Sequence, residues 1–335
     1  MTILRKVLRY AVIVVVALGA VGATYQWLAS RADEQRFPMP GERVGIGGRS
    51  LHLYCSGHGA TTVLLESGLG GDASSWRPVQ AGIAPFARVC SYDRAGLGWS
   101  DPSDRPTRAS NVTDDLHRLL VAKNIGAPFV LVGWSAGGVF VRNYYATYPD
   151  GVIGMVLVES SHEQQRDRLD GPEAAVKALR DSLRSLALCR ALAWSGAVRL
   201  SGTMAKIQAP LHLSADVGDE IIAMENRTGY CTGVAGETRD FDADISQPDP
   251  PRSLGDLPLV VLTRGLKSSA KDMPVPVSQD YLDRADKNWF SMQDELAALS
   301  THAAHRVVPN SGHAIPLQAP DSVIDAVRDI VDGRI

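Results

Sequence analysis

Residues 129–148 read FVLVGWSAGGVFVRNYYATY, an apolar run that passes through small residues into an amphipathic segment. The first part predicts a short strand over 129–133, and the second predicts a helix over 137–148. The turn between them, Gly133-Trp134-Ser135-Ala136-Gly137, matches the Gly-x-Ser-x-Gly pattern in the strand, turn and helix context that a nucleophilic serine requires. The glycines let the backbone close this sharp turn without side-chain clashes. The stretch therefore predicts Ser135 as a nucleophile, and the alternative is a glycine-rich connection with an inert serine.

A serine nucleophile needs a base, and His313 is the candidate. Residues 306–313, RVVPNSGH, predict a brief strand that runs into a loop carrying this histidine. An unperturbed imidazole titrates near pH ~6.5, so it can take a proton from serine and return it to a leaving group near neutral pH. The other histidines are expected to be surface or structural residues: His52, His58, His117, His162, His212, His302 and His305.

The predicted site also needs donors for the negative charge that develops on a carbonyl oxygen. Residues 62–71, TVLLESGLGG, predict a strand that opens into a glycine-rich loop. We expect the backbone amides of Leu69 and Ala136 to form this oxyanion hole, with a simple turn as the alternative interpretation. Each such donor contributes about 10²- to 10³-fold to the rate.

Four segments together resemble the α/β-hydrolase superfamily: residues 67–71 (SGLGG), 91–100 (SYDRAGLGWS), 133–137 (GWSAG) and 311–313 (SGH). The resemblance covers roughly residues 43–332. The most specific segment is 91–100, because Asp-Arg-x-Gly-x-Gly-x-Ser commonly follows the fourth strand in members of the family. From the residues themselves, Asp93 and Arg94 are expected to stabilise this loop rather than to perform chemistry.

The resemblance implies a doubly wound α/β fold, with a mostly parallel eight-stranded sheet, helices on both faces and a helical cap inserted after the sixth strand. The residues support this independently, because after a first hairpin the apolar runs alternate with helical patterns such as 110–124 and 137–148. The expected strands are residues 43–47, 51–55, 62–66, 88–92, 129–133, 153–158, 258–263 and 305–308.

The expected organisation of the chain has four parts: residues 1–37 as an N-terminal segment and linker, 38–160 as the first part of the hydrolase core, 161–252 as the cap, and 253–335 as the second part of the core. The cap segment has helical patterns and no strong strand pattern. Its apolar side chains either line a pocket for an acyl chain or pack between the cap helices; they include Leu186, Leu188, Trp194, Val198 and Leu200.

The acid of the triad has two candidate positions. Shortly after the seventh strand, a usual location in the family, residues 262–272 read LTRGLKSSAKD, and Asp272 can serve only if that loop folds back. The family's other location is the end of the sixth strand, where Glu159 directly follows an apolar run. A carboxylate there can receive the histidine N–H, fix its tautomer and stabilise the imidazolium. We therefore favour Glu159 over Asp272, and Asp286 is a further alternative.

The predicted chemistry is hydrolysis of a carboxylic ester or related acyl bond: Ser135 attacks the carbonyl, His313 shuttles the proton, and water hydrolyses the acyl-enzyme. No cofactor is needed. A serine at this turn disfavours the epoxide hydrolase and haloalkane dehalogenase branches, which the family runs with aspartate. Ester, lipid, lactone, thioester and amide substrates all stay open. So do two other functions on the same fold, an acyltransferase and a membrane-tethered binding protein without turnover.

Composition excludes several classes. The chain has 335 residues and a formal net charge of −3, so we expect no nucleic-acid partner. It contains no G-x-x-x-x-G-K-[ST] loop, no CxxC pair and no H-E-x-x-H helix, and we therefore expect no nucleotide or metal site. The oligomeric state stays open.

The amino terminus predicts a membrane segment. Arg5, Lys6 and Arg9 precede an uncharged, mostly apolar stretch, residues 10–30, whose length matches a bilayer span of about 20 residues. The basic flank favours a cytoplasmic N-terminus and a hydrolase domain outside. We favour a single-pass anchor over a cleaved signal peptide, for which small residues near Ala23 offer a cleavage position. Either way the domain is exported.

Export makes disulfides the expected state of the four cysteines. Cys55 and Cys90 fall on strands that are neighbours in the implied fold, and Cys189 and Cys231 both fall in the cap. We therefore expect Cys55 to pair with Cys90 and Cys189 with Cys231, with buried free thiols as the alternative.

Overall fold

The computed structural model describes residues 2–169, 171, 173–245, 253–271, 273 and 276–335. Within them, eight strands form one sheet in the order β1-β2-β4-β3-β5-β6-β7-β8. Strand β2 is antiparallel to both of its neighbours, and all the other pairs are parallel. The strands are β1 (Glu42–Gly45), β2 (Ser50–Ser56), β3 (Thr62–Glu66), β4 (Arg88–Tyr92), β5 (Phe129–Trp134), β6 (Val152–Val158), β7 (Leu259–Arg264) and β8 (Ala303–Val308). The predicted mostly parallel eight-stranded sheet is confirmed.

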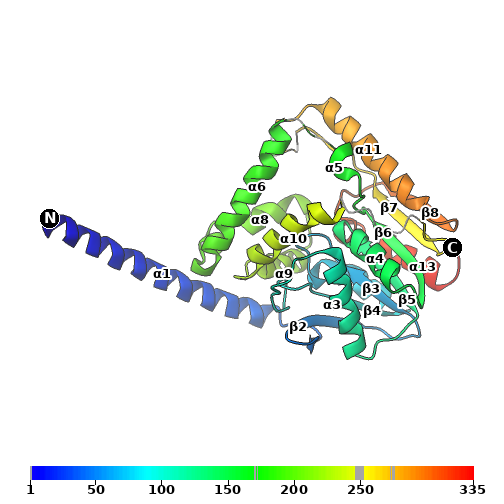
Figure 1. Ribbon diagram of the computed structural model, residues 1–335, viewed down its shortest axis with the longest axis horizontal. Coiled ribbons are helices and arrows are strands. Elements are labelled where there is room, and N and C mark those ends of the chain that lie inside the picture. Colours follow the sequence, from blue (N-terminus) through cyan, green and yellow to red (C-terminus); the bar gives the residue numbers. More distant parts are fainter. Residues whose placement is uncertain (1, 170, 172, 246–252, 272, 274–275) are drawn as a thin grey trace.

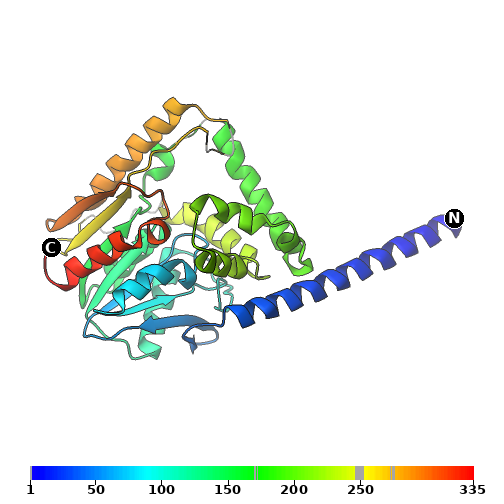
Figure 2. The same cartoon turned by 180° about the vertical axis from the view of Figure 1, so that it is seen from behind.

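Helices cover both faces of the sheet, as a doubly wound fold requires. Alternate strand residues point to opposite faces, so Leu131 of β5 joins one buried cluster while Val130 and Val132 join the other. Figure 1 looks onto the face covered by α3 (Ala109–Ala122) and α4 (Ala136–Thr147). Figure 2 shows the opposite face, where α13 (Pro320–Val331, red) packs beside α2 (Arg77–Ile83).

The other helices of the core are short or lie at its edge. They are η1 (Ala73–Trp76), α2 (Arg77–Ile83), α11 (Gln279–Ala297) and α12 (Ile315–Gln318). Helix α11 packs against β7 and β8, and its Trp289 and Asp286 hydrogen-bond with residues at the carboxyl ends of the sixth and seventh strands. That position matters for the site described below.

Between β6 and β7 the described residues form helices and turns, in agreement with the helical cap expected there. These helices are α5 (Gln165–Arg168), α6 (Glu173–Leu192), η2 (Ala193–Ser195), α7 (Ala197–Leu200), α8 (Thr203–Gln208), η3 (Ala209–Leu211), α9 (Ala215–Glu225) and α10 (Tyr230–Ile245). The last residues of the predicted cap, 246–252, lie outside the described residues.

Two disulfides join the cysteines in the expected pairs. Cys55 and Cys90 are direct register partners on β2 and β4 and are bonded to each other. Cys189 of α6 is bonded to Cys231 of α10, so this bond ties two helices within the cap. Neither bond crosses from the core to the cap.

The N-terminal segment is a single long helix, α1 (Thr2–Arg36), which extends away from the α/β domain (Figures 1 and 2). It is long and apolar enough to cross a membrane, with a mean hydropathy of 2.1 in its most apolar window. Its carboxyl-terminal half contacts the cap at η2 and continues into the linker that leads to β1.

The apolar residues of the cap were expected either to line an acyl pocket or to pack between helices. Leu188 and Leu200 do neither, because their side chains are exposed, and the half-exposed Trp194 lies against α1 at Gly19. An amphipathic pattern sets which residues share one side of a helix, but it does not state what covers that side. These three side chains lie at the end of the cap that is closest to α1.

Candidate active site

The turn between β5 and α4 has the geometry of a strained nucleophile turn. Ser135 has a φ of +55°, a left-handed conformation that a residue with a side chain adopts only at a cost. Its N–H donates to the carbonyl oxygen of Val158 at 3.0 Å, which ties the turn to β6. A Cβ added at Gly133 would lie 2.5 Å from the carbonyl oxygen of Gly137. A side chain at this position would therefore clash with the backbone, which explains the glycine.

Glu159 directly follows the neighbouring strand β6, and its backbone is also left-handed, with a φ of +46°. Its side chain is fully buried, at 0% exposed. One of its oxygens, Oε2, lies 3.1 Å from Nδ1 of His313. Two residues far apart in the sequence, both predicted for the site, thus meet as a carboxylate and an imidazole.

Two further residues donate hydrogen bonds to the Glu159 carboxylate. The backbone N–H of Arg264, at the end of β7, donates to Oε1 at 2.8 Å, and the guanidinium of Arg264 donates to Oε2 at 2.6 Å. Trp289 of α11 donates its indole N–H to Oε1 at 3.0 Å. Burial alone would raise the pKa of Glu159, but the hydrogen bond with His313 and the positive charge of Arg264 more than offset it, and the pKa is lowered. The carboxylate therefore stays ionised beside the imidazole.

Aromatic side chains define the position of the half-exposed His313. Its ring lies 5.9 Å from the ring of Trp134 and 6.2 Å from that of Trp289, measured between centroids. Trp134 also donates its indole N–H to the carbonyl oxygen of His313 at 2.8 Å. Since Trp134 directly precedes Ser135, the loop that carries the candidate base is attached to the turn that carries the candidate nucleophile.

The glycine-rich loop after β3 borders the same turn. A Cβ added at Gly68 would lie 3.1 Å from the Cβ of Ser135. Ala136 is the first residue of α4, where a backbone N–H has no acceptor within its own helix. The amides of Leu69 and Ala136 therefore belong to two segments that approach each other at the Ser135 side chain, as an oxyanion hole requires.

Arg94 connects this loop to the cap. Its buried guanidinium donates to the carbonyl oxygens of Ser67 at 2.7 Å and Gly68 at 2.6 Å. It also pairs at 2.6 Å with Glu66 at the end of β3 and at 2.6 Å with Glu237 of the cap helix α10. Glu237 in turn accepts from the backbone N–H of Gly70 at 2.8 Å. Through these contacts Arg94 can hold the loop after β3 in place, which is the stabilising role expected for it.

Replacing Arg94 with lysine is expected to lower kcat about 10- to 10²-fold while leaving KM nearly unchanged. Lysine keeps the charge but lacks the planar fork that binds two carbonyl oxygens and two carboxylates at once. The measurement is steady-state turnover of a nitrophenyl ester as a test substrate, with Arg105→Lys on the same connection as the matched control. Equal losses in both variants, or a loss confined to KM, would contradict a positioning role.

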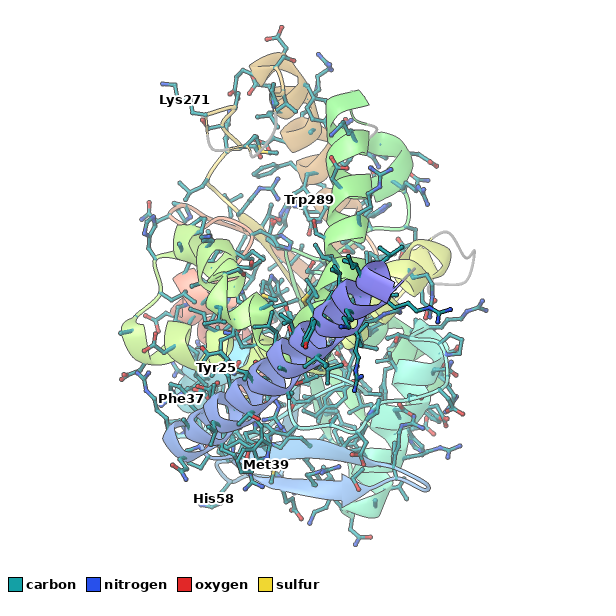
Figure 3. All side chains as sticks on the ribbon, turned by 90° about the vertical axis from the view of Figure 1, so that its left-hand side faces the viewer. Tyr25, Phe37, Met39, His58, Lys271 and Trp289 are labelled. Carbon is teal, nitrogen blue, oxygen red and sulfur yellow. A yellow bond between two sulfur atoms is a disulfide. The ribbon has the colours of Figure 1, made fainter. Side chains whose placement is uncertain are left out.

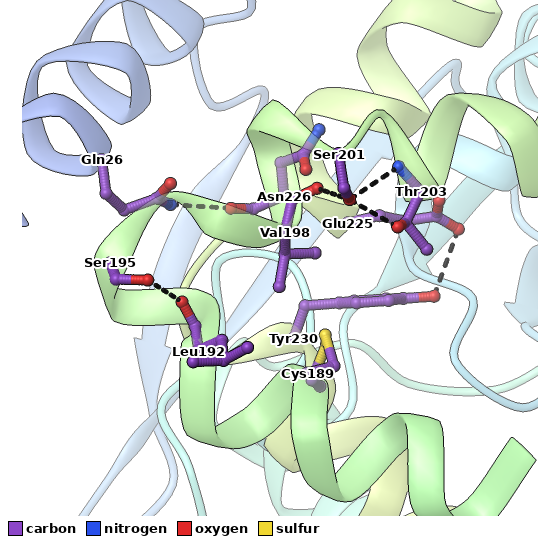
Figure 4. Close-up of a disulfide and its surroundings, with 11 residues drawn as sticks. Gln26, Cys189, Leu192, Ser195, Val198, Ser201, Thr203, Glu225, Asn226 and Tyr230 are labelled. Carbon is purple, nitrogen blue, oxygen red and sulfur yellow. Dashed lines mark hydrogen bonds between the residues drawn. A yellow bond between two sulfur atoms is a disulfide. The ribbon is translucent and has the colours of Figure 1, made fainter. Parts of the chain in front are cut away.

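A second buried carboxyl in the cap gives a stability prediction. Burial is the main cause that raises the pKa of Glu225 to about 7, and the charge of Asp72 adds to it, although Tyr230 donates a hydrogen bond to it at 3.1 Å (Figure 4). The folded chain thus keeps a proton there that the unfolded chain has already lost. Stability must therefore fall as the pH rises from the ordinary glutamate range to about 7, by up to about 3 kcal/mol.

Glu225→Gln removes this titration. We expect the melting temperature of the variant, relative to the wild type, to be several degrees higher at pH 8 than at pH 5. Thermal unfolding of the full chain in detergent at the two pH values measures this, with the exposed Glu42→Gln on β1 as control. A difference that does not change with pH would show that Glu225 is not the responsible group.

The alternative acids differ in position. Asp286 of α11 accepts from the Arg264 guanidinium at 3.0 Å and from the backbone N–H of Ser268, and among the described residues it forms no ion pair with His313. Asp272 lies outside the described residues. The described residues contain no group of three His, Cys, Asp or Glu side chains placed to hold a metal ion.

Sequence reasoning missed three residues of this neighbourhood. Arg264 and Trp289 hold the carboxylate, and Glu237 holds Arg94. Of these, only Arg264 had a local signal, because it stands directly at the end of the seventh strand where the family often carries its acid nearby. Trp289 and Glu237 lie on helices whose patterns carry no such information.

A doubly wound sheet with a strained serine turn, a carboxylate and histidine in contact, and an inserted helical cap defines the class of α/β hydrolases. Comparison with known proteins agrees. The model of the alpha/beta hydrolase family matches residues 63–326, and the chain belongs to this family.

The chain is also similar to curated proteins and to solved structures. It is 26% identical over 280 residues to an AB hydrolase superfamily protein of Gibberella zeae, covering 80% of this chain and 85% of that protein. It is 26% identical over 307 residues to the probable transporter efuK of Hormonema carpetanum, of which it spans 42% while 86% of this chain is covered. The crystal structure of the enol-lactonase from Burkholderia xenovorans LB400 superposes with a TM-score of 0.61 at 19% identity, covering 87% of this chain and all of that one, 100%.

Proposed function

We propose that this protein is a serine hydrolase that cleaves a carboxylic ester or a related acyl bond. The observation that carries the proposal is the 3.1 Å contact of Glu159 with Nδ1 of His313, next to the left-handed Ser135. A buried, ionised carboxylate on Nδ1 leaves Nε2 as the nitrogen that takes and returns a proton. That is the arrangement a serine nucleophile needs.

In the proposed mechanism Ser135 attacks the carbonyl carbon as His313 removes its hydroxyl proton. The charge on the carbonyl oxygen is stabilised by the amides of Leu69 and Ala136. His313 then protonates the leaving alcohol, and the acyl-enzyme forms. Water, deprotonated by the same histidine, attacks the acyl-enzyme. His313 then returns this proton to the oxygen of Ser135 as the carboxylic acid leaves. Apart from the substrate and the water, every group in these steps belongs to the chain.

We also propose that α1 anchors the protein in a membrane with the hydrolase domain on the outer side. The support is the basic flank of Arg5, Lys6 and Arg9 before an apolar helix long enough to span. The two disulfides fit an oxidising compartment. An N-terminal sequence of the mature protein that begins near Thr24 would instead indicate a cleaved signal peptide.

The catalytic proposal is tested by labelling the full chain, in detergent, with a fluorophosphonate probe and locating the label by peptide mass spectrometry. We expect the label on Ser135, together with turnover of nitrophenyl esters whose preferred chain length reports on the acyl site. Product ester in the presence of an added alcohol would indicate an acyltransferase. Absence of both label and turnover in a folded chain would favour a binding protein and reject the hydrolase.

A further inference from the structure

We propose that one end of the cap, residues 188–207, is inserted into the membrane that α1 crosses. It lies in the leaflet that faces the hydrolase domain. The occupant of this surface is lipid, and the cap end is a second membrane contact beside the helix. The inference rests on the proposed anchoring and adds to it a lipid-facing surface on the domain itself.

The first support is direct packing of the cap on the apolar part of α1. A Cβ added at Gly19 would lie 3.2 Å from the ring of Trp194, and one added at Gly22 would overlap the carbonyl oxygen of Ser195. The helix backbone and η2 are thus in van der Waals contact. Figure 3, which looks onto the side from which α1 extends, shows the helix running in front of the domain, with Tyr25 labelled.

The second support is a set of polar contacts that hold the cap and α1 together. Gln26 is buried, and its amide donates at 2.8 Å to the carbonyl oxygen of Asn226 (Figure 4). Arg199 of α7 pairs with Asp33 at 2.6 Å. Since these contacts lie just beyond the apolar packing, the depth of α1 in a bilayer determines the depth of η2.

The third support is the depth in the bilayer at which η2 contacts α1. A bilayer core needs about 20 consecutive residues of helix. Every window of that length within residues 3–30 contains both Gly19 and Gly22. Wherever the span is placed on α1, Trp194 is therefore carried to the level of the hydrocarbon. A tilt of the helix changes the depth of Trp194 in the bilayer, but Trp194 stays on the hydrocarbon side of the interface.

The surface of the cap end fits this environment. Among the described residues after α1, five of the eleven exposed large apolar side chains fall in this 20-residue stretch: Leu188, Leu192, Trp194, Leu200 and Ile207. Leu188 is 61% exposed, Leu200 70% and Ile207 59%. The indole N–H of Trp194 donates to the carbonyl oxygen of Ala191 at 2.8 Å, so immersion in lipid leaves it satisfied.

The charged residues of the stretch are compatible with an interface. Arg190 and Lys206 are exposed, and long basic side chains can bury their stems while their charges reach lipid headgroups. Arg199 is already paired with Asp33. Within the described stretch 188–207 there is no acidic side chain to be repelled by an anionic lipid surface.

The test places an environment-sensitive fluorophore on single introduced cysteines of the full chain, with its native disulfides intact, in vesicles of phosphatidylcholine and phosphatidylglycerol. The sites are Leu200→Cys and Ile207→Cys on the cap end, Val14→Cys in the middle of α1, and Val307→Cys on β8. Val307 is the matched control, because it is 52% exposed on the last strand at the opposite edge of the sheet. Quenching by phospholipids with a nitroxide on the acyl chain is measured at each site.

We expect quenching at Val14, Leu200 and Ile207 to be about twofold or more above that at Val307, with blue-shifted emission at the same three sites. Quenching at Val14 with both cap sites equal to Val307 would overturn the cap proposal and leave the anchor intact. Absence of quenching at Val14 would overturn the anchor and, with it, the cap proposal. Neither result affects the labelling of Ser135, so the catalytic proposal is judged separately.

Discussion

Ser135→Ala is expected to reduce kcat for ester hydrolysis by about 10⁴-fold or more. The variant keeps the backbone turn, because alanine is no larger than serine, but it lacks the oxygen that forms the acyl-enzyme. The left-handed φ of +55° is kept at the same cost by either residue, so the fold should be unaffected. Steady-state kinetics and intact-mass detection of the acyl-enzyme with a slow ester are the measurements.

The control for this variant is Ser110→Ala in the first turn of α3, an exposed serine away from the turn. We expect it to behave as the wild type. Retention of more than about a hundredth of the activity in Ser135→Ala would mean that another group is the nucleophile.

Glu159→Gln is expected to lower kcat by about 10⁴-fold. Glutamine has nearly the same shape, but it is neutral and no longer stabilises the imidazolium or selects the tautomer of His313. The variant also removes the ion pair with Arg264, so a loss of stability is expected beside the loss of activity. Activity should be measured well below the melting temperature of the variant.

The chain offers a control that separates these two effects. Asp286 is the other carboxylate on Arg264, at 3.0 Å, so Asp286→Asn perturbs the arginine without removing the partner of His313. Asp286→Asn and Asp272→Asn are both expected to retain most of the activity. A larger loss in Asp272→Asn than in Glu159→Gln would reverse the assignment of the acid.

Much of the fold was predictable because its signals are local. Strand β5 and helix α4 are adjacent in the sequence, and their periodicity changes at a single serine turn. All eight predicted strands are present, with ends that differ by a few residues, since backbone pairing and not hydrophobicity ends a strand. The cysteine pairs followed from the expected neighbours of β2 and from the extent of the cap.

Residues of the candidate site could be predicted only where they lie within a local sequence motif. Ser135 and His313 each follow an apolar run in a recognisable context, and Glu159 directly follows β6, the strand that pairs with the β5 strand before Ser135. The donors that keep Glu159 ionised were not predictable, because Trp289 lies 130 residues away on a helix whose pattern records only which side is buried.

The sequence by itself determined the class of fold, the turn that holds Ser135, the two residues expected to act with it, and an apolar helix long enough for a bilayer. These are encoded by periodicity, small residues at a tight turn and the length of an apolar run. Only the tertiary structure decided which side chains surround them: Arg94 joined to Glu237 across 143 residues, and the cap end set against α1. Such contacts depend on how whole elements pack, and no local pattern specifies the partner of a side chain on another element.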